Sequence, residues 1–242
     1  MTLLHMVLLG IGMLLSLAAA GYVKYQFARG QEVRLRSRMT GAEVARRILS
    51  DQDITDVEVH EHQGFLSDHY NPGNKTLNLS PDVYNGRSAA AAGVAAHEVG
   101  HAVQHARGDV TMWARSILVY PAHFGGMLAP FLVIGGLALG SAHQIAAGKP
   151  GFAAGLAYAG VGLFAVALLC SLFIVWNEFD ASSKAKTSLV RLGITNGEEE
   201  DSSVRAVLFA AGLTYVASAV IAAMELAYWA AQAGLFGGNR QS

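Results

Sequence analysis

The sequence is poor in cysteine and in charged residues, and both shortages argue against classes of protein. Its 242 residues include one cysteine, Cys170, so the chain can form neither an internal disulfide nor a cysteine-rich zinc site. Charged residues make up 14% of the chain, against about 25% in soluble domains, and the formal net charge is −1. A net charge this small argues against nucleic acid as a partner. Hydrophobic residues, by contrast, make up 52%, which disfavours an ordinary soluble globule.

Four apolar stretches are long enough to cross the hydrocarbon core of a membrane, which takes about 20 residues. They cover residues 3–23, 117–142, 152–176 and 207–233. No lysine or arginine precedes the first stretch, unlike a signal peptide, so we expect an uncleaved anchor. The composition therefore predicts a mostly α membrane protein with four transmembrane helices, in which 117–176 forms a hairpin and 234–242 a tail.

The basic residues predict the orientation of these spans. Fifteen of the 17 lysine and arginine residues lie in segments 24–116 and 177–206, and only Lys149 and Arg240 lie elsewhere. Basic loops stay on the cytoplasmic side of a membrane. We therefore expect both segments in the cytoplasm and both chain termini outside.

The first cytoplasmic segment, 24–116, has the pattern of a small α/β unit. Thr40 and Glu43 form a capping-box pattern ahead of an apolar helical face. Alternating apolar residues on either side of a turn signal at 71–74 predict a small antiparallel sheet over 56–80. Ser88 is placed to cap an alanine-rich helix over 89–107, which Gly108 would end.

That last helix carries the residues that indicate chemistry. His97 and His101 are four residues apart, so both imidazoles lie on one helical face and can reach a single zinc ion. Glu98, beside the first histidine, is placed to act as general base on a water at the open zinc position. His105 is about 12 Å from His97 along the helix axis, too far to share the ion, and is expected to pack or to support a ligand.

Two histidines leave a third protein ligand to be found. The candidates on the same side of the membrane are His60, Glu61, His62, Asp68, His69, Glu178 and Asp180. Glu178 has the best position, because the chain returns through the third span to the face where the histidines lie. Ser182, one helical turn later, is placed for a supporting hydrogen bond. Asp180 is expected to point to the opposite side of that helix.

Other polar residues allow more than one interpretation. His69 and Tyr70 end a predicted strand and are candidates to bind substrate or the oxyanion of the reaction, although Tyr84 and Tyr215 are equally conceivable. Glu225 lies inside the fourth span, either as a functional or bundle-bonding carboxylate or as a protonated or snorkelling side chain. His123 and His143 receive no role.

Several segments together resemble a known family. The run AAHEVGHAVQHA around His97 and NEFDAS around Glu178, with LSDHYNP, LNLSPDVY and AAGLTYVASA, is similar to membrane zinc metallopeptidases of the YugP type. More distantly the chain resembles the HtpX and CAAX prenyl protease group, in which an aspartate stands where this chain has Ser182. The likeness implies a gluzincin-like site with Zn²⁺, one ion per chain, Glu178 as third ligand and Glu98 as base.

The resemblance and the motif together predict an integral membrane zinc metalloendopeptidase of the bacterial inner membrane. Its substrate would be a peptide or a membrane protein, and its active site would face the cytoplasm. The alternative is a non-catalytic membrane scaffold or binding protein with a structural metal site. Glu98 separates the two, because a structural site needs no base and tends to have four protein ligands.

Overall fold

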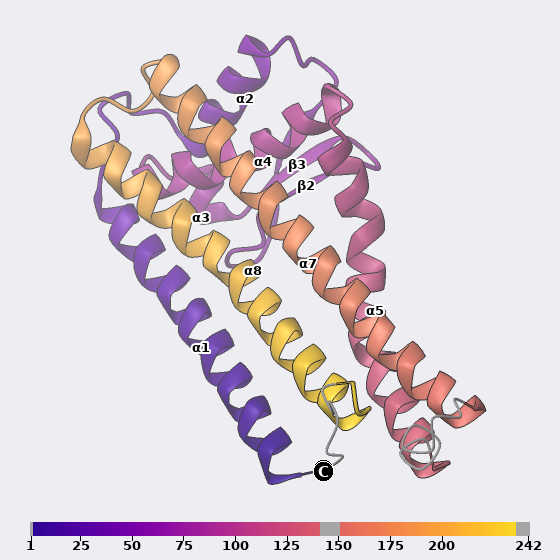
Figure 1. Ribbon diagram of the computed structural model, residues 1–242. Helices are drawn as coiled ribbons and strands as arrows, with labels where there is room; N and C mark the ends of the chain where they lie inside the picture. The colour runs from indigo at the N-terminus through magenta and orange to yellow at the C-terminus, as the bar shows by residue number, and fades with distance from the viewer. Residues whose placement is uncertain (1, 141–150, 236–242) are drawn as a thin grey trace. The chain divides into compact units, whose positions relative to one another are not determined.

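The computed structural model describes residues 2–140 and 151–235, most of them helical (Figure 1). His143, Lys149 and Arg240 lie outside the described residues. The helices are α1 (Leu3–Glu32), α2 (Gly41–Asp51), α3 (Pro81–Tyr84), α4 (Ala89–Ala106), α5 (Val110–Ala138), α7 (Phe152–Arg191) and α8 (Glu198–Gln232). Three short strands complete the described elements: β1 (Glu58–Glu61), β2 (His69–Asn71) and β3 (Thr76–Leu79).

Within the described residues, three helices are long and apolar enough to cross a membrane: α1, α7 and α8. They contain the predicted spans 3–23, 152–176 and 207–233. The remaining predicted span, 117–142, overlaps α5, whose described apolar part, His123–Ala138, is shorter than a full span. A fourth membrane helix therefore stays a prediction.

The apolar helices run well beyond the stretches that predicted them. α1 continues through Lys24 and Arg29 to Glu32, and α7 is a single helix of 40 residues (Figure 1). A helix satisfies its own backbone hydrogen bonds, so nothing requires it to end where the apolar run ends. Phe27, in the added part of α1, is 1% exposed and packs in the same hydrophobic core as Val44, Leu77 and Val99.

The chain divides into two compact units. One unit comprises the described parts of residues 1–16, 115–175 and 215–242, and we call it the bundle unit. The other comprises residues 17–114 and 176–214, and we call it the α/β unit. α7 and α8 each contribute residues to both units.

The α/β unit is built around α4. Thr40 caps α2 with both hydrogen bonds of the predicted capping box, and α2 buries Val44 and Ile48. Leu77 of β3 and Val99 of α4 are fully buried in the same core. Burying such side chains contributes about 1.5–3 kcal/mol each, which holds α4 rigidly between α2 and the sheet.

The sheet differs from the predicted antiparallel pair. It has three strands in the order β1–β3–β2, with β2 and β3 antiparallel and β1 and β3 parallel. The chain reverses twice, between β1 and β2 and again between β2 and β3, so β1 and β3 run in the same direction. β3 is the central strand because Leu77 and Leu79 face the core, whereas β1 is largely exposed.

Candidate metal centre

Residues at its two ends determine where α4, the helix that carries the histidines, begins and stops. Ser88 Oγ accepts a hydrogen bond from the amide of Ala91 and starts α4, and Gly108, with φ +62°, follows its end as predicted. The intervening helix places His97 and His101 on one face with their ring centroids 4.8 Å apart. The HExxH spacing thus gives two neighbouring imidazoles without help from the rest of the chain.

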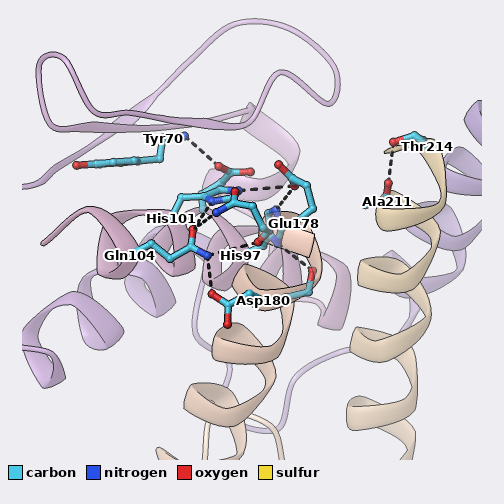
Figure 2. Close-up of polar contacts among 11 residues, drawn as sticks. Tyr70, His97, His101, Gln104, Glu178, Asp180, Ala211 and Thr214 are labelled. Atoms are coloured by element: carbon cyan, nitrogen blue, oxygen red, sulfur yellow. Dashed lines mark hydrogen bonds and ion pairs between the residues drawn. The ribbon is translucent and has the colours of Figure 1, made fainter. Parts of the chain in front are cut away.

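A carboxylate from α7 completes the cluster. Glu178 Oε2 lies 3.2 Å from His97 Nε2 and 3.7 Å from His101 Nε2. Figure 2 shows the three side chains pointing toward one another, and their possible ligand atoms all lie within 4.8 Å. Glu178 and His101 are each 3% exposed and His97 is 12% exposed. The site is therefore shielded from bulk water, with His97 as its most accessible member.

These residues fit a zinc ion. Zinc bonds nitrogen and carboxylate oxygen at about 2.0–2.2 Å, so neighbouring ligand atoms in a tetrahedral site are about 3.3 Å apart. The two measured separations, 3.2 and 3.7 Å, bracket that value. Two neutral imidazoles and one carboxylate are also a donor set that catalytic zinc uses, with a fourth position left open.

The close approach of α4 to α7 depends on a glycine inside the motif. A Cβ atom on Gly100 would lie 2.7 Å from the carbonyl oxygen of Ala181 on α7. That contact is shorter than side chains tolerate, and the obstacle is backbone that cannot rotate away. Gly100 therefore allows α7 to come near enough for Glu178 to reach the histidines.

Glu98 lies beside the cluster and is held by the sheet. It is 8% exposed, and its Oε2 accepts a 2.9 Å hydrogen bond from the backbone amide of Tyr70 on β2 (Figure 2). The Tyr70 hydroxyl lies 2.7 Å from His105 Nδ1, so the tyrosine ring joins β2 to α4. β2 is an edge strand in this sheet, and its free edge is the one that meets Glu98.

Comparisons with known proteins agree with this geometry. A family model described as "putative neutral zinc metallopeptidase" matches residues 5–234. The chain belongs to this zinc metallopeptidase family. It is also 41% identical over 212 residues to a protein of Bacillus subtilis (strain 168) named "Putative membrane protease YugP", covering 88% of each chain. The resemblance drawn from the motifs is thereby confirmed. No solved structure gives a significant match.

In this zinc metallopeptidase family member, each histidine of the cluster has a buried partner behind it. Ser182 Oγ lies 3.1 Å from His97 Nδ1, so Ser182 supports a histidine rather than Glu178. Gln104 Oε1 lies 3.0 Å from His101 Nδ1. With hydrogens on both Nδ1 atoms, each ring directs its Nε2 lone pair toward Glu178 and a metal between them.

Gln104 is itself held from two sides. It is fully buried, donates through Nε2 to Asp180 Oδ2 at 2.6 Å, and accepts from Asn177 Nδ2 at 3.2 Å. These bonds fix which end of the amide faces His101 (Figure 2). The prediction that Asp180 points away from the ligands is wrong, because its carboxylate is joined through Gln104 to His101 and also pairs with Lys184.

Sequence reasoning missed Gln104 as a member of the site. The sequence spacing already indicated this role, because residue 104 falls on the same helical face as residues 97 and 101. A buried glutamine with no obvious partner, three residues after a metal-binding histidine, was therefore a candidate for supporting that histidine. Its partners Asn177 and Asp180 lie on α7 and could not be paired with it from the sequence.

Burial changes the acidity of two groups near β2. Desolvation raises the pKa of Asp68, an effect that the charge of Glu98 increases, while hydrogen bonds from the amide and hydroxyl of Ser80 oppose it. Burial, with a smaller contribution from Asp56, raises the pKa of Tyr70 to about 12. The Tyr70 hydroxyl therefore stays protonated at physiological pH and can donate to His105.

The remaining ligand candidates lie elsewhere in the described structure. His60 pairs with Glu58, and Asp68 binds Ser80. His69 is exposed, with its Nδ1 2.8 Å from the carbonyl oxygen of Ser67. Among the described residues, the histidine and acidic groups that gather closely enough to hold one metal ion are His97, His101 and Glu178.

Proposed function

We propose that this protein is an integral membrane zinc metalloendopeptidase, with one zinc ion per chain held by His97, His101 and Glu178. The observation that carries the proposal is the buried carboxylate of Glu98 beside a cluster of three ligands. A structural zinc site is usually closed by four protein ligands and has no use for a base. Three ligands and a neighbouring carboxylate are the arrangement of a hydrolytic site.

In the proposed reaction Glu98 moves the protons. It takes one from the attacking water and passes it to the nitrogen of the leaving amine, which returns the carboxylate to its starting state. A bound zinc ion would supply the Lewis acid that polarises the scissile carbonyl and acidifies the water. The Tyr70 amide, 2.9 Å from Glu98 Oε2, keeps the carboxylate in position between the two transfers.

The edge strand β2 is the proposed binding surface for an extended peptide. Such strands pair with a substrate backbone through hydrogen bonds, and the Tyr70 amide already points to Glu98. His69 and Tyr70 are the proposed donors to substrate or to the oxyanion. The hydroxyl of Tyr70 is engaged by His105 and its backbone amide by Glu98, so a donation from Tyr70 to substrate requires one of these two contacts to open, whereas the side chain of His69 is exposed.

The proposed location is the bacterial inner membrane, with four spans, both termini outside and the metal centre at the cytoplasmic face. Its support is the concentration of 15 of the 17 basic residues in segments 24–116 and 177–206. A Lys149→Cys variant should react with a membrane-impermeant thiol reagent in intact cells, and Lys75→Cys should react only after lysis, both in a Cys170→Ser background. Labelling of Lys75→Cys in intact cells would reverse the orientation.

The catalytic proposal is tested by Glu98→Gln. Glutamine keeps an acceptor for the Tyr70 amide but cannot take a proton, so cleavage should fall by about 10²–10⁴-fold while zinc content is unchanged. Cleavage is followed by mass spectrometry on a peptide library in detergent, and bound zinc by elemental analysis. Glu61→Gln, on the exposed strand β1, is the matched control and should retain activity.

Two outcomes would favour the scaffold instead. One is zinc-loaded native protein that cleaves nothing in the library, and the other is a Glu98→Gln protein that retains full biological effect. Both would identify the metal as structural, since neither result needs a base.

A further inference from the structure

Helix α4 carries polar side chains on two different faces. The metal-binding histidines lie on the face that meets α7. Glu98 and His105 lie on a second face, seven residues apart, which is almost two full turns and about 10 Å along the axis. Both of them contact Tyr70 of β2, so this second face meets the sheet. The orientation of the proposed base therefore depends on the sheet and not on the metal ligands.

Tyr70 bonds this second face at two points. Its backbone amide donates to Glu98 Oε2 at 2.9 Å (Figure 2), and its hydroxyl lies 2.7 Å from His105 Nδ1. The hydroxyl keeps its proton at physiological pH, so it donates and Nδ1 accepts. Two contacts that lie two helical turns apart fix the place of Tyr70 along α4 and the direction of its amide.

Glu98 presents one oxygen to the strand and leaves the other free. Oε2 accepts the hydrogen bond from the Tyr70 amide. Oε1 has no hydrogen bond within the described residues, and it is not cut off from solvent. Oε1 is therefore the oxygen that can take a proton from a water molecule, provided that Oε2 stays where the amide holds it.

The strand that supplies this amide has little else to hold it. β2 is three residues long, lies at the edge of the sheet and pairs with β3 alone. Segments with few backbone hydrogen bonds open more readily than the core. The bond from the Tyr70 hydroxyl to His105 ties the strand to α4, which is held in the core.

These contacts give His105 a role in the reaction that we have proposed. We propose that His105 is a positioning residue, which holds Tyr70 so that the Tyr70 amide fixes Glu98 Oε2 and leaves Oε1 to act as the base. This inference rests on the proposed peptidase function. His105 itself does not reach the metal, since it lies about 12 Å from His97 along the helix axis.

Three variants of the full, zinc-loaded chain test the link. Tyr70→Phe removes the hydroxyl and keeps the ring and the amide. His105→Leu removes the acceptor, whereas His105→Asn is the conservative variant, because the asparagine oxygen takes the place of Nδ1. Tyr70 and His105 line a pocket of about 420 Å³, so water can satisfy the group that is left behind and the variants should fold.

The kinetic effect should fall on kcat. Tyr70→Phe and His105→Leu should each lower kcat about 3–10-fold, the size of one hydrogen bond, and leave KM unchanged, because proton transfer occurs in the transition state. The double variant should lose no more than either single one, because both groups act through one bond. His105→Asn should restore most of kcat. Tyr25→Phe, which removes an exposed hydroxyl from α1, is the matched control and should keep native kcat.

Hydrogen exchange of the Tyr70 amide tests the same link without a substrate. Labelling with ¹⁵N-tyrosine gives one amide signal for each of the eight tyrosines, and the Tyr70 signal is the one that Tyr70→Phe lacks. In His105→Leu this amide should exchange about 3–10-fold faster, because it must leave Glu98 Oε2 in order to exchange. His105→Asn should return the rate to the native value.

Native kcat or native amide exchange in His105→Leu would overturn the proposal. A rise in KM at constant kcat would also overturn it, because the pair would then serve substrate binding on β2. Loss of zinc from His105→Leu, measured by elemental analysis, would overturn it as well, since His105 would then support the metal. If the native zinc-loaded protein cleaves no peptide, the proposed function fails, and amide exchange still measures the link between His105 and Tyr70.

Discussion

Replacing Gly100 by alanine should remove zinc without unfolding the protein. The new Cβ would meet the Ala181 carbonyl oxygen at 2.7 Å, whereas ordinary contacts begin near 3.4 Å, so α4 and α7 must separate by about 0.7 Å. His97 and His101 move with one helix and Glu178 with the other. Zinc sites tolerate ligand distances that vary by about 0.2 Å, so one ligand should be lost or stretched.

The expected size of the effect follows from that displacement. We expect zinc affinity to fall by about 10–100-fold, the range seen when a metal site loses the support that orients a ligand. Overpacking should cost about 1–3 kcal/mol of folding free energy, of which the better helix propensity of alanine returns about 1 kcal/mol. The variant should therefore remain folded and be recovered with little metal.

The same helix offers a matched control. A Cβ atom on Gly93 would meet Val204 Cγ1 at 3.4 Å, which is ordinary contact, so Gly93→Ala should keep zinc and gain slightly in stability. Competition with a chromogenic chelator measures zinc affinity in detergent, and circular dichroism checks that the helices remain. Native zinc affinity in Gly100→Ala would show that the helix spacing does not position Glu178.

Two further predictions concern the ligands and their support. Glu178→Ala should lose most of its bound zinc, because two histidines alone bind zinc weakly, and should keep its helical content, because packing holds the helices. Zinc is measured by elemental analysis, and full occupancy in this variant would exclude Glu178 as a ligand. Gln104→Leu removes the hydrogen-bond acceptor for His101 and the donor to Asp180. It should lower zinc affinity about 10–100-fold, measured by chelator competition. Native affinity in this variant would show that the Gln104 amide does not orient His101.

Local patterns in the sequence predicted much of the fold because they depend on neighbouring residues alone. The capping box at Thr40 and the serine cap and glycine end of α4 are built from residues within one or two turns. Three of the four predicted spans lie in α1, α7 and α8, which are long and apolar enough to cross a membrane, because a long apolar run is visible in the composition alone. The sheet was predicted less well, because the order of its strands depends on tertiary packing. β3 is central because Leu77 and Leu79 are buried in the hydrophobic core.

In the metal centre, too, some features follow from local sequence and others from tertiary packing. The sequence by itself determined that His97 and His101 share a helical face with Glu98 beside them, because a spacing of four residues has that result in any α-helix. Only the tertiary structure decided which carboxylate joins them, since Glu178 is 81 residues from His97.

The same holds for the contacts behind the ligands. Asp180 supports His101 through Gln104, and Gly100 matters because backbone of α7 passes 2.7 Å from where its Cβ would be. These relations depend on how two helices pack. No local pattern specifies that packing, because it is the result of every buried side chain between the helices.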